Sequence, residues 1–221
     1  MFSFRIAASA LVLAAGASLS ACDNTATQET AAVQPEAATA EAVKAPIIHI
    51  DNFTLADEAG QEHTLYDLKD APAVVLVMHG NGCPIVQRLT PTLKEAAAAY
   101  RPKGVKFFMI NSNSQDTPEA IAKEVDKYEL GIHVLKDADQ TLGHELGAER
   151  TAEVFVVDPK TWDVVFHGPI DDRLTYGLEK PRPEKFYLND TLDAMLAGQP
   201  VPQIEAKADG CIINYIEPDK A

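Results

Sequence analysis

The 221-residue sequence contains only three cysteines, Cys22, Cys83 and Cys211. Three are too few for a disulfide scaffold, and they lack the closely spaced pairs of a structural zinc site. Basic residues are also scarce, with 19 Lys and Arg against 33 Asp and Glu and a formal net charge of −14. Because a nucleic-acid-binding domain needs a basic face, this charge balance excludes nucleic acid as a partner.

Other features are missing as well. No phosphate-binding loop and no dinucleotide fingerprint occurs, so we expect no cofactor. The six histidines are scattered and form no HxxxH pair, which gives no indication of a metal site. Hydrophobic residues make up 46% of the chain and charged residues 24%, which excludes disorder throughout and allows a sizeable core.

A long apolar run is absent everywhere except near the N-terminus. A short positive segment ending at Arg5 is followed by a run of about 14 small and apolar residues, too short for a membrane span but typical of a signal peptide. The sequence Leu-Ser-Ala-Cys that ends at Cys22 resembles a bacterial lipobox. We therefore expect a lipoprotein signal peptide over residues 1–21 and a lipid on Cys22. The alternative is an N-terminal helix that is retained.

The next segment, residues 22–45, is rich in Ala, Thr, Glu, Gln and Pro and has almost no large apolar residue, so we expect a flexible tether. A lipid-anchored, exported protein on the periplasmic face of a bacterial membrane follows from these two features. That compartment is oxidising, which allows the two other cysteines to pair.

From residue 46 onward the pattern changes to one folded domain that ends at residue 221. Strands alternate with helices, which predicts a parallel sheet with helices on both faces, and a late antiparallel pair makes the sheet mixed. This α/β order is typical of the thioredoxin-like fold, with an added N-terminal β-hairpin. The expected elements are a hairpin over 47–65, strands at 73–78, 105–110, 134–135, 153–157 and 164–167, helices at 84–100, 117–128, 140–146 and 186–196, and a long loop over 171–185.

Cys83 follows a glycine-rich turn, Gly80-Asn81-Gly82, at the point where a buried strand leads into a helix. A helix N-terminus presents free N–H groups and a partial positive charge, so we expect a thiolate at Cys83. Pro84 suits the first helical turn, and Arg88 one turn later adds positive charge. His79 either adds charge from the strand side or is a satisfied strand-end histidine. The alternative for Cys83 itself is a small buried hydrophobe.

Several short motifs occur in a characteristic order. The chain resembles the thioredoxin-like redoxin family, the group that contains peroxiredoxins and TlpA-like exported thiol oxidoreductases, over residues 46–215. The resemblance places the nucleophilic cysteine at Cys83. It rests on Phe53-Thr54-Leu55, Cys83-Pro84, Asn111-x-Asn113, Asp137 to Gly143, Glu153-Val154-Phe155-Val156, Ile170 to Arg173 and Gly210-Cys211.

Three positions depart from the family pattern. Val86 stands where thioredoxins carry a second cysteine, and Gly80 stands where peroxiredoxins carry a threonine. Ala152 follows Thr151 where the family has a cis-proline, so we expect a trans bond there. In the family this loop lies against the active cysteine and docks the substrate chain, which makes ordinary substrate docking doubtful here.

Cys211 is expected to pair with Cys83, with Cys83 as nucleophile and Cys211 as resolving thiol. A permanent disulfide that holds the C-terminal segment is the alternative, and the chain-entropy model gives it roughly 4–5 kcal/mol of stabilisation. Thr151, Glu153 and Arg173 are supporting candidates. Glu153 would accept a proton and Arg173 would steady an anion, or each is an ordinary carboxylate or surface charge.

These patterns favour a periplasmic, lipid-anchored thiol-dependent oxidoreductase that performs thiol–disulfide exchange or peroxide reduction. Its partners would be a peroxide or a protein disulfide as substrate, a reducing partner protein or thiol donor, and the membrane through an N-terminal lipid. The alternative is a copper metallochaperone or binding module without turnover, with His79 and Cys83 as ligands beside Met78.

Overall fold

The computed structural model describes residues 48–175, 177–204 and 206–216. The expected signal peptide, Cys22 and the tether lie outside the described residues. Among the described helices, none is long and apolar enough to cross a membrane.

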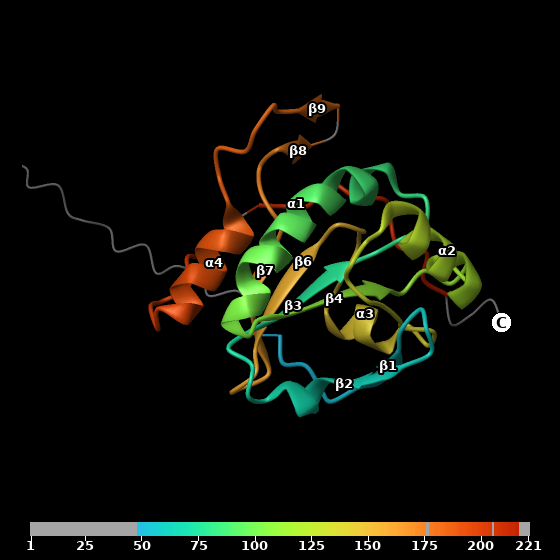
Figure 1. Ribbon diagram of the computed structural model, residues 1–221, viewed down its shortest axis with the longest axis horizontal. Helices are drawn as coiled ribbons and strands as arrows, with labels where there is room; N and C mark the ends of the chain where they lie inside the picture. Colours follow the sequence, from blue (N-terminus) through green and yellow to red (C-terminus); the bar gives the residue numbers. More distant parts are fainter. Residues whose placement is uncertain (1–47, 176, 205, 217–221) are drawn as a thin grey trace, which may run out of the picture. The chain divides into compact units, whose positions relative to one another are not determined.

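A five-stranded mixed sheet forms the centre of the domain, in the order β5-β4-β3-β6-β7 (Figure 1). Strand β3 runs parallel to β4, which runs parallel to β5, whereas β6 pairs antiparallel with both β3 and β7. The strands are β3 (Val74–Met78), β4 (Lys106–Asn111), β5 (Val134–Lys136), β6 (Val154–Asp158) and β7 (Asp163–Gly168). This topology confirms the mixed sheet and the thioredoxin-like fold.

Helices cover both faces of the sheet because successive side chains of its buried strands point to opposite sides. One face packs against α1 (Pro84–Tyr100), α2 (Pro118–Tyr128) and α4 (Tyr187–Leu196). The other face packs against α3 (Thr141–Glu145) and the 3₁₀ turn Leu65–Leu68, and a further 3₁₀ turn, Arg101–Lys103, follows α1. These helices begin or end within one or two residues of their expected bounds.

The added hairpin is present as a separate two-stranded sheet of β1 (Thr54–Ala56) and β2 (Glu62–Thr64). Asp57 closes its turn, since its Oδ1 accepts the N–H groups of Ala59 and Gln61, both at 2.9 Å. Apolar residues of this segment, Leu55 of β1 among them, pack against the α3 face of the central sheet. The hairpin expected from the sequence is therefore confirmed.

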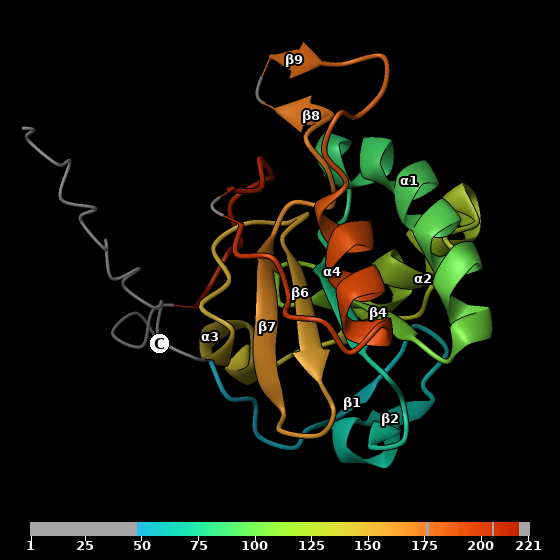
Figure 2. The same cartoon turned by 90° about the vertical axis from the view of Figure 1, so that its left-hand side faces the viewer.

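The segment expected as a long loop over 171–185 contains a small antiparallel hairpin of β8 (Leu174–Thr175) and β9 (Leu178–Glu179). Figure 2 shows this hairpin extending above α1 and α4, away from the sheet. Each strand has two residues, too few to show a two-residue periodicity in the sequence, so the prediction of a plain loop was wrong.

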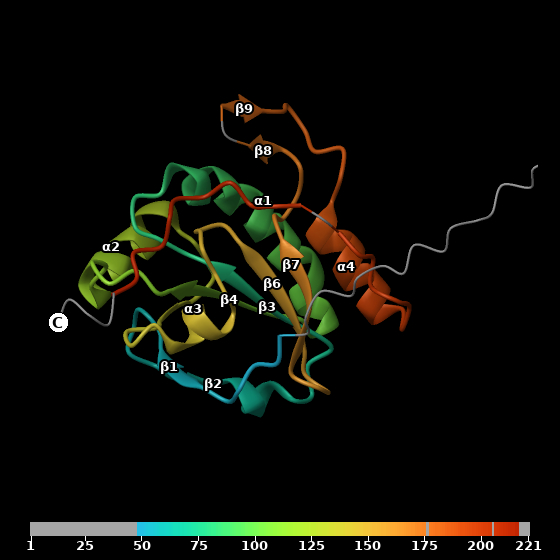
Figure 3. The same ribbon diagram turned by 180° about the vertical axis from the view of Figure 1, so that it is seen from behind.

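The C-terminal segment, residues 206–216, crosses the end of the sheet from the α4 side to the α2 side, as the red trace in Figure 3 shows. Ile212 forms an antiparallel bridge with Arg150, and the N–H of Ile213 donates to the carbonyl of Glu149 at 2.9 Å. The side chain of Ile213 is buried in the core on the α3 face. The segment is thus packed as part of the domain.

Candidate functional site

Cys83 is the N-cap of α1, directly before Pro84. Strand β3 ends at Met78, and Gly82 has a φ of 72°, which glycine adopts without strain, so the chain turns sharply before the helix. Only 3% of Cys83 is exposed. The expected position at a strand-to-helix turn is therefore observed, with the thiol turned inward.

The hydroxyl of Thr151 links Cys83 to Cys211. Its Oγ1 lies 3.0 Å from the Sγ of Cys83 and accepts the N–H of Cys211 at 2.9 Å. Because the Cys211 N–H occupies a lone pair of this oxygen, the hydroxyl proton is free to point at the Cys83 sulfur. The Thr151 N–H in turn donates to the carbonyl of Cys211 at 2.8 Å.

Hydrogen bonds of this kind favour the charged form of a thiol. Burial raises the pKa of the Cys83 thiol, but hydrogen bonds from the side chains of Cys211 and Thr151 and from the N–H of Val86 outweigh it and hold the pKa below its usual range. Burial and the neighbouring Cys83 raise the pKa of Cys211 to about 11. The two sulfurs therefore have unequal acidity, with Cys83 the more acidic thiol and Cys211 the less acidic one.

Local contacts explain two of the departures from the family pattern, Gly80 and Ala152. A Cβ on Gly80 would lie 2.7 Å from the Thr151 Cγ2 and 2.9 Å from the Asn113 Nδ2, so the space for a side chain is already filled. Ala152 has a φ of 65°, and its N–H donates to the carbonyl of Met78 at 2.7 Å. Proline, with a φ near −65° and no N–H, fits neither feature.

His79 lies at the end of β3 with its side chain fully buried. Its Nδ1 is 3.1 Å from the Asn111 Nδ2, and burial lowers the pKa of the imidazole to about 4. A neutral ring adds no positive charge to the Cys83 site, and these features agree with a strand-end histidine. The expected alternative of a copper site at His79 and Cys83 receives no support from the ring's contact with Asn111.

The side chains of Arg88 and Arg173 form a charged cluster with Glu179, whereas the sequence favoured a supporting role for both at the Cys83 site. Arg88 and Arg173 each lie 3.5 Å from the carboxylate of Glu179 in β9. The Nη2 of Arg173 also donates to the carbonyl of Arg88 at 3.0 Å and to the hydroxyl of Thr92 at 2.9 Å. These contacts hold the β8–β9 hairpin against α1.

Glu153 is buried at the start of β6, on the loop that carries Thr151. Its Oε2 accepts the N–H of Glu149 at 3.2 Å and lies 3.5 Å from the Nε2 of His167. A groove beside this pair is lined by Glu149, Arg150, Glu153, His167 and residues 206–209. Glu153 thus lies at a groove formed by the same loop and C-terminal segment that hold Thr151 and Cys211.

The C-terminal segment is fixed by residues that the sequence did not single out. Gln140 donates through Nε2 to the carbonyl of Asn214 at 2.9 Å and accepts the N–H of Ile216 at 2.8 Å. The Asn113 Oδ1 accepts the N–H of Asn214 at 3.0 Å. Gln140 lies between an aspartate and a helix as an ordinary polar residue, so nothing in its sequence context indicates this role.

The comparison with protein families matches residues 47–162 to the AhpC/TSA family. The chain belongs to this family. The match confirms the resemblance to the redoxins, and it covers the β1–β2 hairpin, Cys83 and the Thr151 loop. No curated protein sequence is significantly similar to the chain.

Solved structures give the same fold. A hypothetical protein from Sinorhizobium meliloti 1021 is 30% identical, with a TM-score of 0.69 over 77% of this chain and 94% of the other. An uncharacterised conserved protein from Geobacillus kaustophilus is 29% identical, with a TM-score of 0.66 over 79% and 94%. A peroxidoxin, BcpB, from Mycobacterium tuberculosis shares the fold at 18% identity and a TM-score of 0.50 over 68% and 94%. The chain is a thioredoxin-like redoxin.

Proposed function

We propose that the protein is a thiol-dependent peroxide reductase in which Cys83 is the nucleophile and Cys211 the resolving thiol. The single observation that carries this proposal is the Thr151 hydroxyl, 3.0 Å from the Cys83 sulfur and 2.9 Å from the backbone nitrogen of Cys211. One side chain thereby favours the thiolate and positions the second cysteine beside it.

The reaction has three steps whose atoms balance. The Cys83 thiolate attacks the peroxide O–O bond and forms sulfenic acid, and the leaving oxygen takes one proton from solvent and departs as an alcohol or water. Cys211 then attacks the Cys83 sulfur, which forms a disulfide and releases water. Two thiols of a donor reduce this disulfide and become a disulfide themselves. Cys83 supplies the electron pair in the first step, and the donor supplies both electrons in the last.

A small oxidant fits the site better than a protein disulfide. Cys83 is only 3% exposed and lies beneath the C-terminal segment, so a protein chain has no direct path to its sulfur. The backbone N–H of Thr151 already donates to the carbonyl of Cys211, so this N–H is not available to bind a substrate chain. Cys211 itself is exposed, so a donor thiol attacks the Cys211 sulfur of the disulfide. Peroxide therefore enters as substrate, and a reducing partner protein or small thiol regenerates the enzyme.

We also propose that the domain is exported and lipid-anchored through Cys22 on the periplasmic face of the membrane. The sequence of residues 1–22 supports this placement. Cys83 and Cys211 alone then form the redox pair, because the third cysteine carries the lipid.

The test is peroxide consumption by the detergent-solubilised full chain, with dithiothreitol as the thiol donor. We expect turnover by the wild type, no turnover above the uncatalysed rate for Cys83→Ser, and unchanged turnover for the control Cys22→Ser. Intact mass after one equivalent of peroxide should show the loss of two hydrogens in wild type. Equal peroxide consumption by wild type and Cys83→Ser would overturn the proposal.

A further inference from the structure

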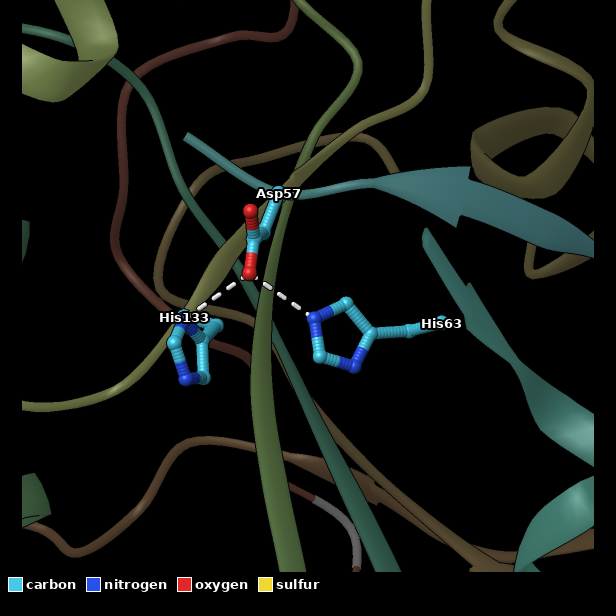
Figure 4. Close-up of side chains that lie close together, drawn as sticks. All are labelled: Asp57, His63 and His133. Atoms are coloured by element: carbon cyan, nitrogen blue, oxygen red, sulfur yellow. Dashed lines mark hydrogen bonds and ion pairs between the residues drawn. The ribbon is translucent and has the colours of Figure 1, made fainter. Parts of the chain in front are cut away.

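A second polar cluster lies between the β1–β2 hairpin and the central sheet, apart from the cysteines. It consists of Asp57 in the hairpin turn, His63 in β2 and His133 directly before β5 (Figure 4). One ligand atom from each of these three side chains lies within 4.8 Å of the other two. Among the described residues, this group of two histidines and a carboxylate could hold a metal ion. The group includes neither His79 nor Cys83.

The Asp57 carboxylate is held so that one oxygen faces both rings. Its side chain is 1% exposed, and its Oδ1 is occupied by the N–H groups of Ala59 and Gln61. Its Oδ2 is left for the histidines, 2.8 Å from the Nε2 of His63 and 3.1 Å from the Nδ1 of His133. A buried carboxylate whose orientation is fixed by backbone hydrogen bonds is typical of a preorganised ligand.

Glu58 adds a second carboxylate to the cluster. Its Oε2 accepts the N–H of Val134 at 2.8 Å, and its Oε1 lies 3.1 Å from the Nδ1 of His133. Asp57, His63 and His133 have ligand atoms close enough to share one ion, and Glu58 lies beside them through its contact with His133. Two neutral rings and two carboxylates carry a charge of −2, which a divalent cation neutralises.

We propose that Asp57, His63 and His133, with Glu58 as fourth ligand, bind a divalent first-row transition metal, with zinc the best fit. Zinc takes four nitrogen and oxygen ligands at about 2.0–2.2 Å in a tetrahedral arrangement, and this donor set provides them. Binding replaces the two N–H···Oδ2 contacts with metal bonds. Each neutral ring then carries its proton on its other nitrogen, so no proton is lost and no redox step is needed.

The position of the cluster indicates what the ion does. β1 and β2 form their own sheet, and β5 is the edge strand of the central sheet. The described contacts of Asp57 and Glu58 with His133 and Val134 link the two. An ion there would bind ligands from both sheets and hold the hairpin on the edge strand. His133 is 52% exposed, which gives the ion a path from solvent.

The test is a zinc titration of the full chain in detergent, read by competition with a chromophoric chelator, in a Cys83→Ser/Cys211→Ser background that removes thiolate binding. We expect one zinc ion per chain and at least a tenfold weaker affinity for His63→Gln and for His133→Gln. His49→Gln is the matched control, because His49 is 53% exposed and pairs with a single carboxylate, Asp163. Its affinity should stay within twofold of the parent.

Two further readouts keep the proposal testable if His63→Gln fails to fold. His133→Gln alters an exposed ring, and its melting temperature without metal should match that of the parent while zinc no longer raises it. Bound cobalt(II) should give the visible spectrum of a tetrahedral nitrogen–oxygen site, lost in His133→Gln. The absence of zinc binding by the parent, or equal affinity of the parent and both histidine variants, would overturn the proposal.

Discussion

The hydroxyl of Thr151 lies 3.0 Å from the sulfur of Cys83, although 67 residues separate the two in the sequence. The same oxygen accepts the N–H of Cys211 at 2.9 Å. One hydroxyl thus connects Cys83 to the segment that carries Cys211. Hydrogen bonds from Cys211 and from this hydroxyl lower the pKa of Cys83, and the same hydroxyl holds the backbone of Cys211.

Replacing Thr151 with valine keeps the shape of the side chain and removes the hydroxyl. A hydrogen bond to a charged group contributes about 1.5–3 kcal/mol, so its loss should raise the pKa of Cys83. The measurement is the pH dependence of the thiolate ultraviolet absorbance in a Cys211→Ser background. Thr151→Ser is the control, because it retains the hydroxyl and should leave the pKa close to that of the parent. Equal pKa values for the valine and serine variants would contradict the proposed role.

Gly80 should tolerate no side chain while Thr151 keeps its position. The Cβ of Gly80→Ala would meet the Thr151 Cγ2 at 2.7 Å, so either the Thr151 side chain moves or the backbone does. Overpacking of this kind costs about 1–3 kcal/mol in the free energy of unfolding. Oxidation of Cys83 by peroxide should slow as well, because the hydroxyl is displaced from the sulfur.

The double variant Gly80→Ala/Thr151→Ser separates this cause from general strain. Serine lacks the Cγ2, so part of the lost stability and part of the oxidation rate should return. Denaturant unfolding of the four proteins of the cycle gives the coupling energy. Strict additivity of the two substitutions would show that the Thr151 methyl group is not the reason for glycine at position 80.

The sequence alone predicted the local parts of the site and missed the contacts between distant segments. Cys83 at a helix N-terminus follows from a buried strand, a glycine-rich turn and a proline within a few residues, all of which are local signals. The contact of Thr151 with Cys83 depends on how β6 aligns with β3, which a single sequence does not determine. The same limit applies to His63 and His133, which appear scattered in the sequence and whose rings lie 5.3 Å apart in the structure.

The sequence predicted the contacts of charged residues less well than those of apolar residues. Arg88 follows Cys83 by about one helical turn, which favoured a role at the thiol. The structure pairs its side chain with Glu179 in a hairpin whose two-residue strands left no periodic pattern. A long flexible side chain reaches one of several nearby carboxylates, and sequence spacing does not decide among them.

Removing the resolving thiol should change the product of peroxide oxidation. In the proposed mechanism, Cys211 traps the sulfenic acid of Cys83 as a disulfide. In Cys211→Ser the sulfenic acid has no intramolecular thiol, so excess peroxide should carry Cys83 on to sulfinic acid. Intact mass spectrometry with a sulfenic-acid trap follows both species. A variant that still consumes peroxide at the wild-type rate, without sulfinic acid, would show that Cys211 is not the resolving thiol.

His79 should make the protein sensitive to acid. Burial lowers the pKa of this histidine from 6.5 to about 4, so the unfolded chain binds a proton at a pH where the native state does not. Stability from this group is therefore complete above pH 6.5 and is lost as the pH falls toward 4. The loss is about 3 kcal/mol at 1.36 kcal/mol for each pH unit.

Urea unfolding of wild type and His79→Asn between pH 7 and pH 4 measures this contribution. Asparagine places an amide oxygen near the position of Nδ1, where the Asn111 N–H can donate to it, and it does not titrate. Between pH 7 and pH 4 the free energy of unfolding should fall by about 3 kcal/mol less in His79→Asn than in wild type. The exposed-site control His49→Asn should show the same pH dependence as wild type. Parallel curves for wild type and His79→Asn would show that His79 titrates normally.

The reduction potential of the Cys83–Cys211 disulfide tests the proposed redox pair most directly. It is measured by equilibrating the full chain with redox buffers of graded potential and counting the oxidised fraction by mass. A pair that cycles with cellular thiol donors should have a potential between about −180 and −280 mV, the range of thiol–disulfide enzymes. A potential below about −300 mV would identify a structural disulfide and contradict Cys211 as a resolving thiol.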